Sequence, residues 1–172
     1  VDVANNAANI TLPNAGAQNS LSSNKAIIVD GTVSTITSVS SDVSDGTYRL
    51  GQTIPIKITF SEAVVVTGTP QLTLETGTND AVVDYSGSGS GSNALTFNYT
   101  VAAGHSVSDL DYVSTSALAL NGGTIKDVAG NASVLTLASP NATNSLGDNK
   151  DFVIDGIVPT VASVSSTITD GT

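Results

Sequence analysis

The chain has 172 residues, of which 40% are apolar and only 12% are charged. Acidic residues outnumber basic ones by 15 to 5, for a formal net charge of -10, which argues against a nucleic-acid partner because phosphate contacts need clustered Lys and Arg. Cysteine, methionine and tryptophan are absent, so no disulfide can form and oxidation has few targets. No apolar run reaches the roughly 18 residues of a membrane span. These features favour an extracellular or cell-surface protein without membrane insertion.

The composition predicts an all-β fold. Val, Ile and Thr fit a pleated surface, while Gly and Asn supply tight corners, and no stretch shows helix-period apolar spacing. Alternation of apolar and polar residues marks the strands in chain order. We expect strands at about 35–41, 53–60, 70–75, 81–86, 94–101, 117–127 (with a glycine bulge), 132–137 and 151–155.

The alternation also predicts which side chains face the core. Within 53–60 it places Lys57 outside, which argues against a lysine–asparagine isopeptide bond there. The strands at 81–86 and 94–101 should form a hairpin across the glycine–serine linker. Seven to nine short strands with frequent turns predict an immunoglobulin-like β-sandwich, with a closed barrel as the alternative. The inward set is Ile54, Ile56, Ile58, Phe60, Leu72, Leu74, Leu95, Phe97, Tyr99 and Val101.

An internal repeat organises the chain. Aligning Asp2 with Asp127, an offset of 125 residues, gives 24 identities in 46 positions without a gap, from 2–47 against 127–172. The chain therefore spans about 1.4 periods of a tandem array. We expect residues 1–31 to be the C-terminal strands of a preceding repeat, 32–156 a complete repeat, and 157–172 the first strand of a following repeat.

Four segments carry a family resemblance: "FSEAVVVTGTPQLTLETG", "LTFNYTV", "LDYVSTSALALNGGTIKDVAGN" and "VIDGIVPTV". They resemble the tandem bacterial immunoglobulin-like (cadherin-like) repeats of giant secreted adhesins and surface proteins. The similarity covers nearly the whole chain. It implies an extracellular stalk of linked domains, and members of this class are often stiffened by calcium.

The stretch "DVAGN", which begins at Asp127 and recurs as "DVANN" at Asp2, has two readings. It is a β-turn whose Asp and Asn bond their own backbone, or it is part of a cation site. If the strand reaching Glu62 and the strand ending at Asp127 run in the same direction, both acids lie at one end, where the linker with Asp30 arrives. We hypothesise a Ca²⁺ site formed by Asp30, Glu62, Asp127 and Asn131.

Other acidic residues are weaker metal candidates. Asp109 and Asp111 share one strand face and could chelate a cation, although a solvated face is the simpler reading. Asp155 repeats the position of Asp30 at the next junction, and Asp2 repeats that of Asp127.

The sequence points away from catalysis. The single histidine, His105, lies in a turn without a nucleophile motif. We therefore expect a non-catalytic spacer of a long extracellular adhesin or surface fibre. Its expected partners are neighbouring repeats of the same chain and, in a fibre, neighbouring copies of the chain. The alternatives are a filament or surface-layer subunit that exchanges strands between chains, and a carbohydrate-binding module, which would need exposed aromatic residues.

Overall fold

A computed structural model describes residues 1–165 and 167 of the chain. The chain divides into two compact units, Val1–Gly31 (unit 1) and Thr32–Thr172 (unit 2). The predicted first strand of a following repeat, 157–172, is without regular secondary structure over 157–165, and its residues 166 and 168–172 lie outside the described part.

Unit 1 consists of turns and one short helix, α1 (Leu21–Asn24). The hydroxyl of Ser20 caps this helix by accepting a hydrogen bond from the backbone N–H of Ser23. Residues 1–31 contain no strand. The helix was not expected from the sequence, since four residues are too few to show an apolar period.

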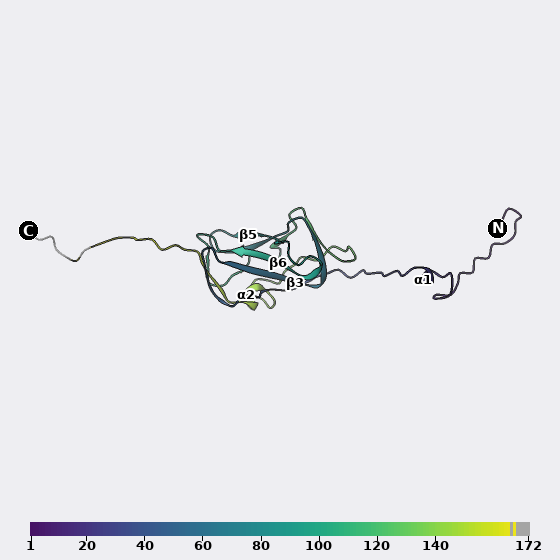
Figure 1. Cartoon of the computed structure of the whole chain (residues 1–172), viewed down its shortest axis with the longest axis horizontal. Coiled ribbons are helices and arrows are strands. Elements are labelled where there is room, and N and C mark those ends of the chain that lie inside the picture. Colours follow the sequence, from purple (N-terminus) through teal and green to yellow (C-terminus); the bar gives the residue numbers. More distant parts are fainter. Residues whose placement is uncertain (166, 168–172) are drawn as a thin grey trace, which may run out of the picture. The chain divides into compact units, whose positions relative to one another are not determined.

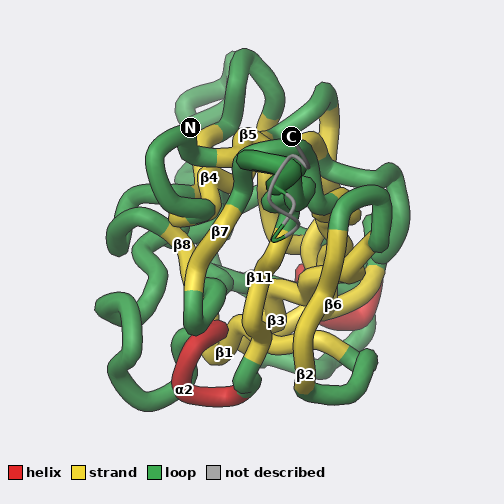
Figure 2. The backbone as a smooth tube through the Cα atoms, turned by 90° about the vertical axis from the view of Figure 1, so that its left-hand side faces the viewer, coloured by secondary structure: helices red, strands yellow, loops and turns green. Residues whose placement is uncertain are grey.

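Unit 2 is mostly β-structure, in agreement with the predicted class, and its strands form three small sheets (Figure 2). A second short helix, α2 (Leu146–Asn149), precedes the last strand. The immunoglobulin-like arrangement of these sheets stays a prediction. The strands are β1 (Ile36–Ser41), β2 (Gly46–Arg49), β3 (Thr53–Thr67), β4 (Gln71–Glu75), β5 (Ala81–Asp84), β6 (Ser92–Thr100), β7 (Ser106–Val107), β8 (Asp111–Tyr112), β9 (Leu118–Ala119), β10 (Thr124–Asp127) and β11 (Phe152–Asp155).

The first sheet is built on β3, which pairs with β1, β6 and β10. The second has the order β2-β11-β7, and in the third β4 pairs with β5, β8 and β9. Pairing is antiparallel between the described strands except for β2 and β11, which run parallel. Figure 2 shows β7 and β11 side by side.

One hydrophobic core joins all three sheets. All ten side chains predicted to face inward are buried, with exposed fractions of 0–1%. Each side chain of that size contributes about 1.5–3 kcal/mol on burial, so the alternating pattern accounts for a large part of the driving force. Lys57 points outward as predicted and forms an ion pair with Asp42.

The long strand β3 has two halves with different partners. Its first half, from Thr53 to Thr59, pairs with β6, and its last four residues pair with β10. The register shifts between Thr59 and Val64, which marks an irregularity where the partner changes. The prediction that the strand ending at Asp127 runs in the same direction as β3 is wrong, because β10 pairs antiparallel with β3 and places Asp127 opposite Val64.

Three further strand predictions need correction. The segment 117–127 is not one bulged strand: Asn121 and Gly122 adopt positive φ (46° and 77°) and separate β9, in the third sheet, from β10, in the first. Residues 132–137 form isolated bridges in place of a strand. The expected hairpin at 81–101 is shorter than predicted: β5 and β6 belong to different sheets, and the antiparallel pairing is limited to the Tyr85–Phe97 bridge and the hydrogen bonds next to it, just after β5.

The start of unit 2 and the point where the chain leaves it lie at different places along β3 (Figure 1). Ile36 pairs with Phe60, whereas Gly156, just after β11, donates its N–H to the carbonyl of His105, in the turn that follows β6. Thr53, at the start of β3, lies opposite the end of β6. Thr53 and Phe60 are seven residues apart, or roughly 23 Å at about 3.3 Å per residue. The two ends of the unit are therefore well separated.

Candidate metal centre

The turn that follows β10 is closed by Asp127. Its Oδ1 accepts the backbone N–H of Asn131 at 2.8 Å, and its Oδ2 accepts the Asn131 side-chain amide at 2.8 Å. Gly130 donates its N–H to the Asp127 carbonyl at 3.2 Å and has φ +98°, a conformation that favours glycine. The turn reading of "DVAGN" is thus confirmed.

Asp127 is buried, with 2% of its surface exposed, and its carboxylate is nevertheless held in the ionised form. Burial acts to raise its pKa, but hydrogen bonds from the Asn131 side chain and from the backbone N–H groups of Asn131, Gly130 and Ala129 outweigh that effect and lower the pKa below its ordinary value. The turn therefore supplies a fixed negative charge at neutral pH.

This turn is also tied to the start of unit 2. The Asn131 amide donates to the Thr32 carbonyl at 3.3 Å, and the backbone N–H of Val134 donates to the Ser34 carbonyl at 2.8 Å. Ser34 is fully buried, and its hydroxyl lies 2.6 Å from that of Ser133. The residues that lead into β1 are consequently fastened to the segment that carries the buried carboxylate.

Three of the predicted ligands form an acidic cluster that could hold a metal ion. Asp30, Glu62 and Asp127 each offer a carboxylate oxygen, and these oxygens lie within 4.8 Å of one another. Asp30 is exposed, Glu62 is half-buried and Asp127 is buried. β3 continues past Glu62 and β10 runs back along this extension, which is why the acids meet although the strand directions differ from the prediction.

The "DVANN" turn of unit 1 has the same hydrogen bonds as its copy. Asp2 Oδ1 accepts the backbone N–H of Asn6 at 2.9 Å, Oδ2 accepts the Asn6 amide at 2.8 Å, and Asn5 takes the position of Gly130 with φ +65°. The side-chain and backbone bonds from Asn6 lower the pKa of Asp2. Asp2 is exposed, in contrast to Asp127.

The second acidic pair does not form a solvated face. Asp111 is 4% exposed and accepts the backbone N–H groups of Tyr112 (2.8 Å) and Asn141 (2.9 Å). Asp109 is half-buried, and its Oδ1 is buried without a hydrogen-bond partner among the described residues. A Cβ built on Gly147 would lie 2.8 Å from Asn141 Oδ1, 3.0 Å from Asp111 Oδ2 and 3.2 Å from Asp109 Oδ2, so the three oxygens surround the space beside this glycine.

Burial raises the pKa of Asp109, and the negative charges of Asp151 and Asp111 raise it further. The folded protein therefore binds this proton more readily than the unfolded chain, and the ionised carboxylate destabilises the fold above its raised pKa. We expect Asp109→Asn to raise the melting temperature at neutral pH. The gain should shrink as the pH falls through the raised pKa toward the ordinary value near 3.8.

Melting of both proteins in EDTA, from about pH 7 down to about pH 3, measures this dependence. Asp80→Asn, at an exposed site, is the matched control and should show no such trend. A gain for Asp109→Asn that stays constant over this range would contradict the assignment.

The remaining candidates have structural partners. Asp155 is exposed and its Oδ1 accepts the backbone N–H of Ile157 at 3.1 Å. His105 Nδ1 accepts the backbone N–H of Ala102 at 3.3 Å and lies 2.9 Å from the Tyr99 hydroxyl. Burial raises the pKa of Tyr99 to about 12, so this hydroxyl stays protonated and donates to the imidazole.

The aromatic side chains do not form an exposed platform in the described residues. Phe60, Phe97, Tyr99, Tyr112 and Phe152 are buried, and the other two tyrosines pack against the core. A flat aromatic surface of the kind that a carbohydrate-binding module would need is therefore not built by these side chains.

No sequence pattern predicted that Asn141 lies beside Asp111, or that both lie beside Gly147. These residues lie 30 and 36 positions from Asp111, and no local spacing signals their approach. A weak signal exists at Gly147, where the first copy of the repeat has Ser22.

No protein-family model matches the chain, and neither the comparison with curated proteins nor that with solved structures gives a match. Among the described residues, no helix has the length and apolar character needed to cross a membrane.

Proposed function

We propose that the protein is a non-catalytic spacer repeat of a long extracellular bacterial adhesin or surface fibre, in which Ca²⁺ stiffens the junctions between immunoglobulin-like domains. The observation that carries this proposal is the acidic cluster of Asp30, Glu62 and Asp127. The cluster includes the linker residue Asp30, which lies two positions before Thr32, the first residue of unit 2.

The chemistry of the cluster favours calcium. Ca²⁺ takes six to eight oxygen ligands from carboxylates, amides, backbone carbonyls and water, and the cluster offers three carboxylates with the Asn131 turn beside them. Soft ligands are missing because the chain has no cysteine, and its one histidine bonds Tyr99 and Ala102. Without a cation the clustered carboxylates repel one another, and a bound cation would remove that repulsion.

The positions of the ends of unit 2 support the spacer role. The chain enters unit 2 beside Phe60, in the middle of β3, and leaves it beside Thr53, at the start of β3, so the two junctions of the domain would be well separated. A domain with both termini at one end could not extend an array in this way.

Matching local conformations support an array of repeated domains. Ser20 caps α1 and Ser145 caps α2, each by accepting the N–H of the residue three positions later. Asn19 and Asn144 precede these caps with φ of 68° and 74°. The positions differ by 125 residues, the period of the sequence repeat.

The second candidate function is a filament subunit that exchanges strands between chains. Its specific support is the apolar surface of unit 1, where Ile10, Leu12, Ile28 and Val29 are each more than 80% exposed. Isolated side chains of this kind are normal on a surface, but a run of them in one short segment indicates a contact with another polypeptide.

Calcium titration tests the first proposal. Metal-free protein titrated with CaCl₂ in a calorimeter should give saturable heat, and calcium should raise the melting temperature of unit 2 because it binds the folded state. Asp30→Asn should weaken binding by about tenfold or more, since it removes one charged ligand at an exposed position.

Asp155→Asn is the matched control, because Asp155 occupies the same repeat position but lies at the other end of unit 2. Its titration should equal that of the unaltered chain. No heat and an unchanged melting temperature on adding calcium would refute the metal site, and equal affinity for Asp30→Asn would refute its location.

A further inference from the structure

The strands β5 and β6 meet at one point and then part. Tyr85, just after β5, bridges Phe97 in β6, and the two strands run antiparallel there. If that register continued, Val82 would lie opposite Thr100, but β5 and β6 form no further bridge within the described residues. A slot of about 360 Å³ lies between them instead, with Val82 and Thr100 in its lining. The slot is therefore a gap in an interrupted ladder.

The edge of β5 that faces the slot carries backbone groups that β4 does not use. Tyr85 donates its N–H to the carbonyl of Pro70, so alternate residues of this antiparallel ladder, Tyr85 and Val83, bond the side of β4. The N–H and C=O of Val82 consequently point to the opposite edge. β5 is the edge strand of the third sheet, so no strand of that sheet lies beside these groups in the described part of the chain.

The edge of β6 across the slot is open in the same way. Asn98 lies opposite Pro55 in β3, and proline has no N–H with which to complete a hydrogen-bonded pair. The backbone groups of Asn98, and of Thr100 two positions later, therefore point away from β3. Thr96 shows the same period, because its N–H and its carbonyl bond the loop that follows β5. Two strand edges thus face each other across the slot.

The slot has the length of a short extended peptide. From Tyr85 back to Val82 the strand advances by three residues, or roughly 10 Å at about 3.3 Å per residue. Val83 and Tyr99 also line the slot, and their side chains are already buried in the core, with 7% and 1% exposed. A strand added here would therefore direct only small side chains inward. Its main-chain groups would supply the hydrogen bonds that the two edges lack.

Charge determines which peptide the slot favours. Asp84 lines the slot, Asp80 directly precedes β5, and both are exposed. Among the described residues that line the slot, none is Lys or Arg. The chain carries a net charge of -10, so a second copy would bring like charge to this edge. Basic side chains beside Asp84 complement it instead.

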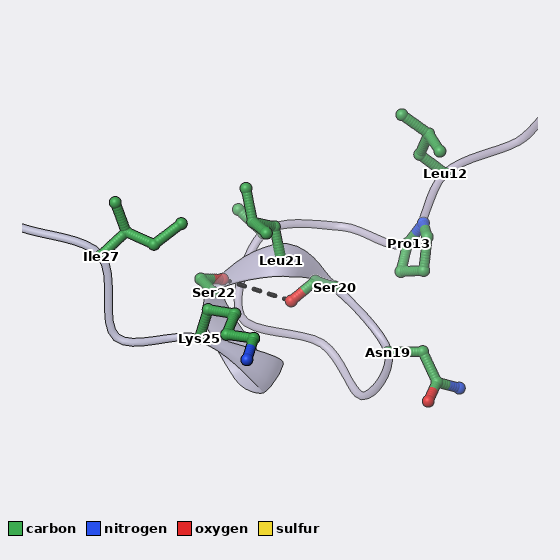
Figure 3. Close-up of a pocket in the computed structure, with 9 residues that line it drawn as sticks. Leu12, Pro13, Asn19, Ser20, Leu21, Ser22, Lys25 and Ile27 are labelled. Carbon is green, nitrogen blue, oxygen red and sulfur yellow. Dashed lines mark hydrogen bonds between the residues drawn. The ribbon is translucent and has the colours of Figure 1, made fainter.

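The hollow of unit 1 lacks both features. It measures about 510 Å³ and is lined by apolar side chains that include Leu12, Leu21 and Ile27 (Figure 3). Residues 1–31 contain no strand, so no strand edge faces this hollow. The charged residue in its lining is Lys25. A basic extended peptide therefore has no reason to bind there, and this hollow provides a control.

We propose that the slot between β5 and β6 binds an extended basic peptide of a partner protein by strand addition. Three or four peptide residues would pair with the edge at Val82 on one side and the edge at Thr100 on the other. Small side chains would face inward, and Lys or Arg would face outward beside Asp84. The peptide would join the first sheet to the third. This site goes beyond the spacer role and needs no calcium.

The first test uses the unaltered chain and the peptide acetyl-Lys-Ala-Lys-Ala-Lys-amide, in EDTA at about 150 mM salt to screen exposed charges. Titration followed by NMR should saturate, and the amide hydrogens of Val82 and Thr100 should exchange more slowly with peptide bound. Acetyl-Lys-Pro-Lys-Pro-Lys-amide has the same charge but lacks two N–H donors, so it should bind about tenfold or more weakly. Equal binding of the two peptides, or unchanged exchange at Val82 and Thr100, would overturn the proposal.

The second test places the peptide on the chain. Val82→Pro removes the N–H that faces the slot and leaves the bonds to β4 in place, so it should abolish binding. Val82→Ala keeps that N–H and should bind within about threefold of the unaltered chain. Asp84→Asn should weaken binding, whereas Leu21→Asp, in the hollow of unit 1, should not. Full binding to folded Val82→Pro, or loss of binding in Leu21→Asp, would contradict the location.

Both tests are read without calcium. Their failure would leave the metal site at Asp30 intact, and an absence of calcium binding would leave the peptide slot intact.

Discussion

Leu146→Ala is expected to lower the free energy of unfolding of unit 2 by about 2–5 kcal/mol, the range for removing a buried leucine side chain. Leu146 is fully buried in the hydrophobic core of unit 2, and it begins α2. The loss combines the transfer of the side chain with the cavity that remains, since neighbouring strands restrict collapse.

Leu21→Ala is the matched control because it changes the same residue type at the same position of the repeat. Leu21 is 70% exposed, so its replacement should alter the unfolding free energy by no more than about 0.5 kcal/mol. Urea denaturation at low protein concentration measures both. Equal effects of the two substitutions would mean that Leu146 is not part of the core.

Gly123→Ala is expected to destabilise unit 2 by about 1–3 kcal/mol through overpacking, and to weaken calcium binding. A Cβ at Gly123 would lie 2.2 Å from the Thr67 carbonyl oxygen and 3.1 Å from that of Leu120. Both contacts are with backbone, which cannot rotate away. The strain falls at the start of β10, the strand that holds Asp127 opposite Val64.

Gly31→Ala serves as the control for this substitution, because a Cβ there meets no atom within 4 Å. Thermal unfolding with and without calcium distinguishes the two variants. If Gly123→Ala keeps both the melting temperature and the calcium response, the close contact between Gly123 and Thr67 does not fix the position of β10.

The sequence predicted the strands in which successive side chains alternate between a buried face and an exposed face. Ile54, Ile56 and Ile58 could be assigned to the core because burial on one face of a strand imposes a period of two. β7 and β8 have two residues each, which is too few for any period to appear. β9 and β10 are separated by Asn121 and Gly122, which both have positive φ. A glycine in the sequence indicates a break at this point, but it does not indicate that β10 joins a different sheet from β9.

The gathering of Asp30, Glu62 and Asp127 was predicted from the idea that linker and strand ends meet, but the strand direction behind it was wrong. Strand direction depends on which partner each half of β3 selects, and that choice is made by long-range packing. The buried position of Asp111 had no local signal, because Asn141, which donates a hydrogen bond to its carboxylate, lies thirty residues later.

The placement of the two ends of unit 2 determines how the domain responds to a pulling force. Tension applied at Thr32 and Gly156 would act along the strands, because these residues lie at well-separated points along β3. β1 and β11 would carry that tension, and their ladders to β3 and β2 would slide lengthwise. Many interstrand hydrogen bonds would then share the load at the same time, whereas a domain with adjacent ends would open one pair after another.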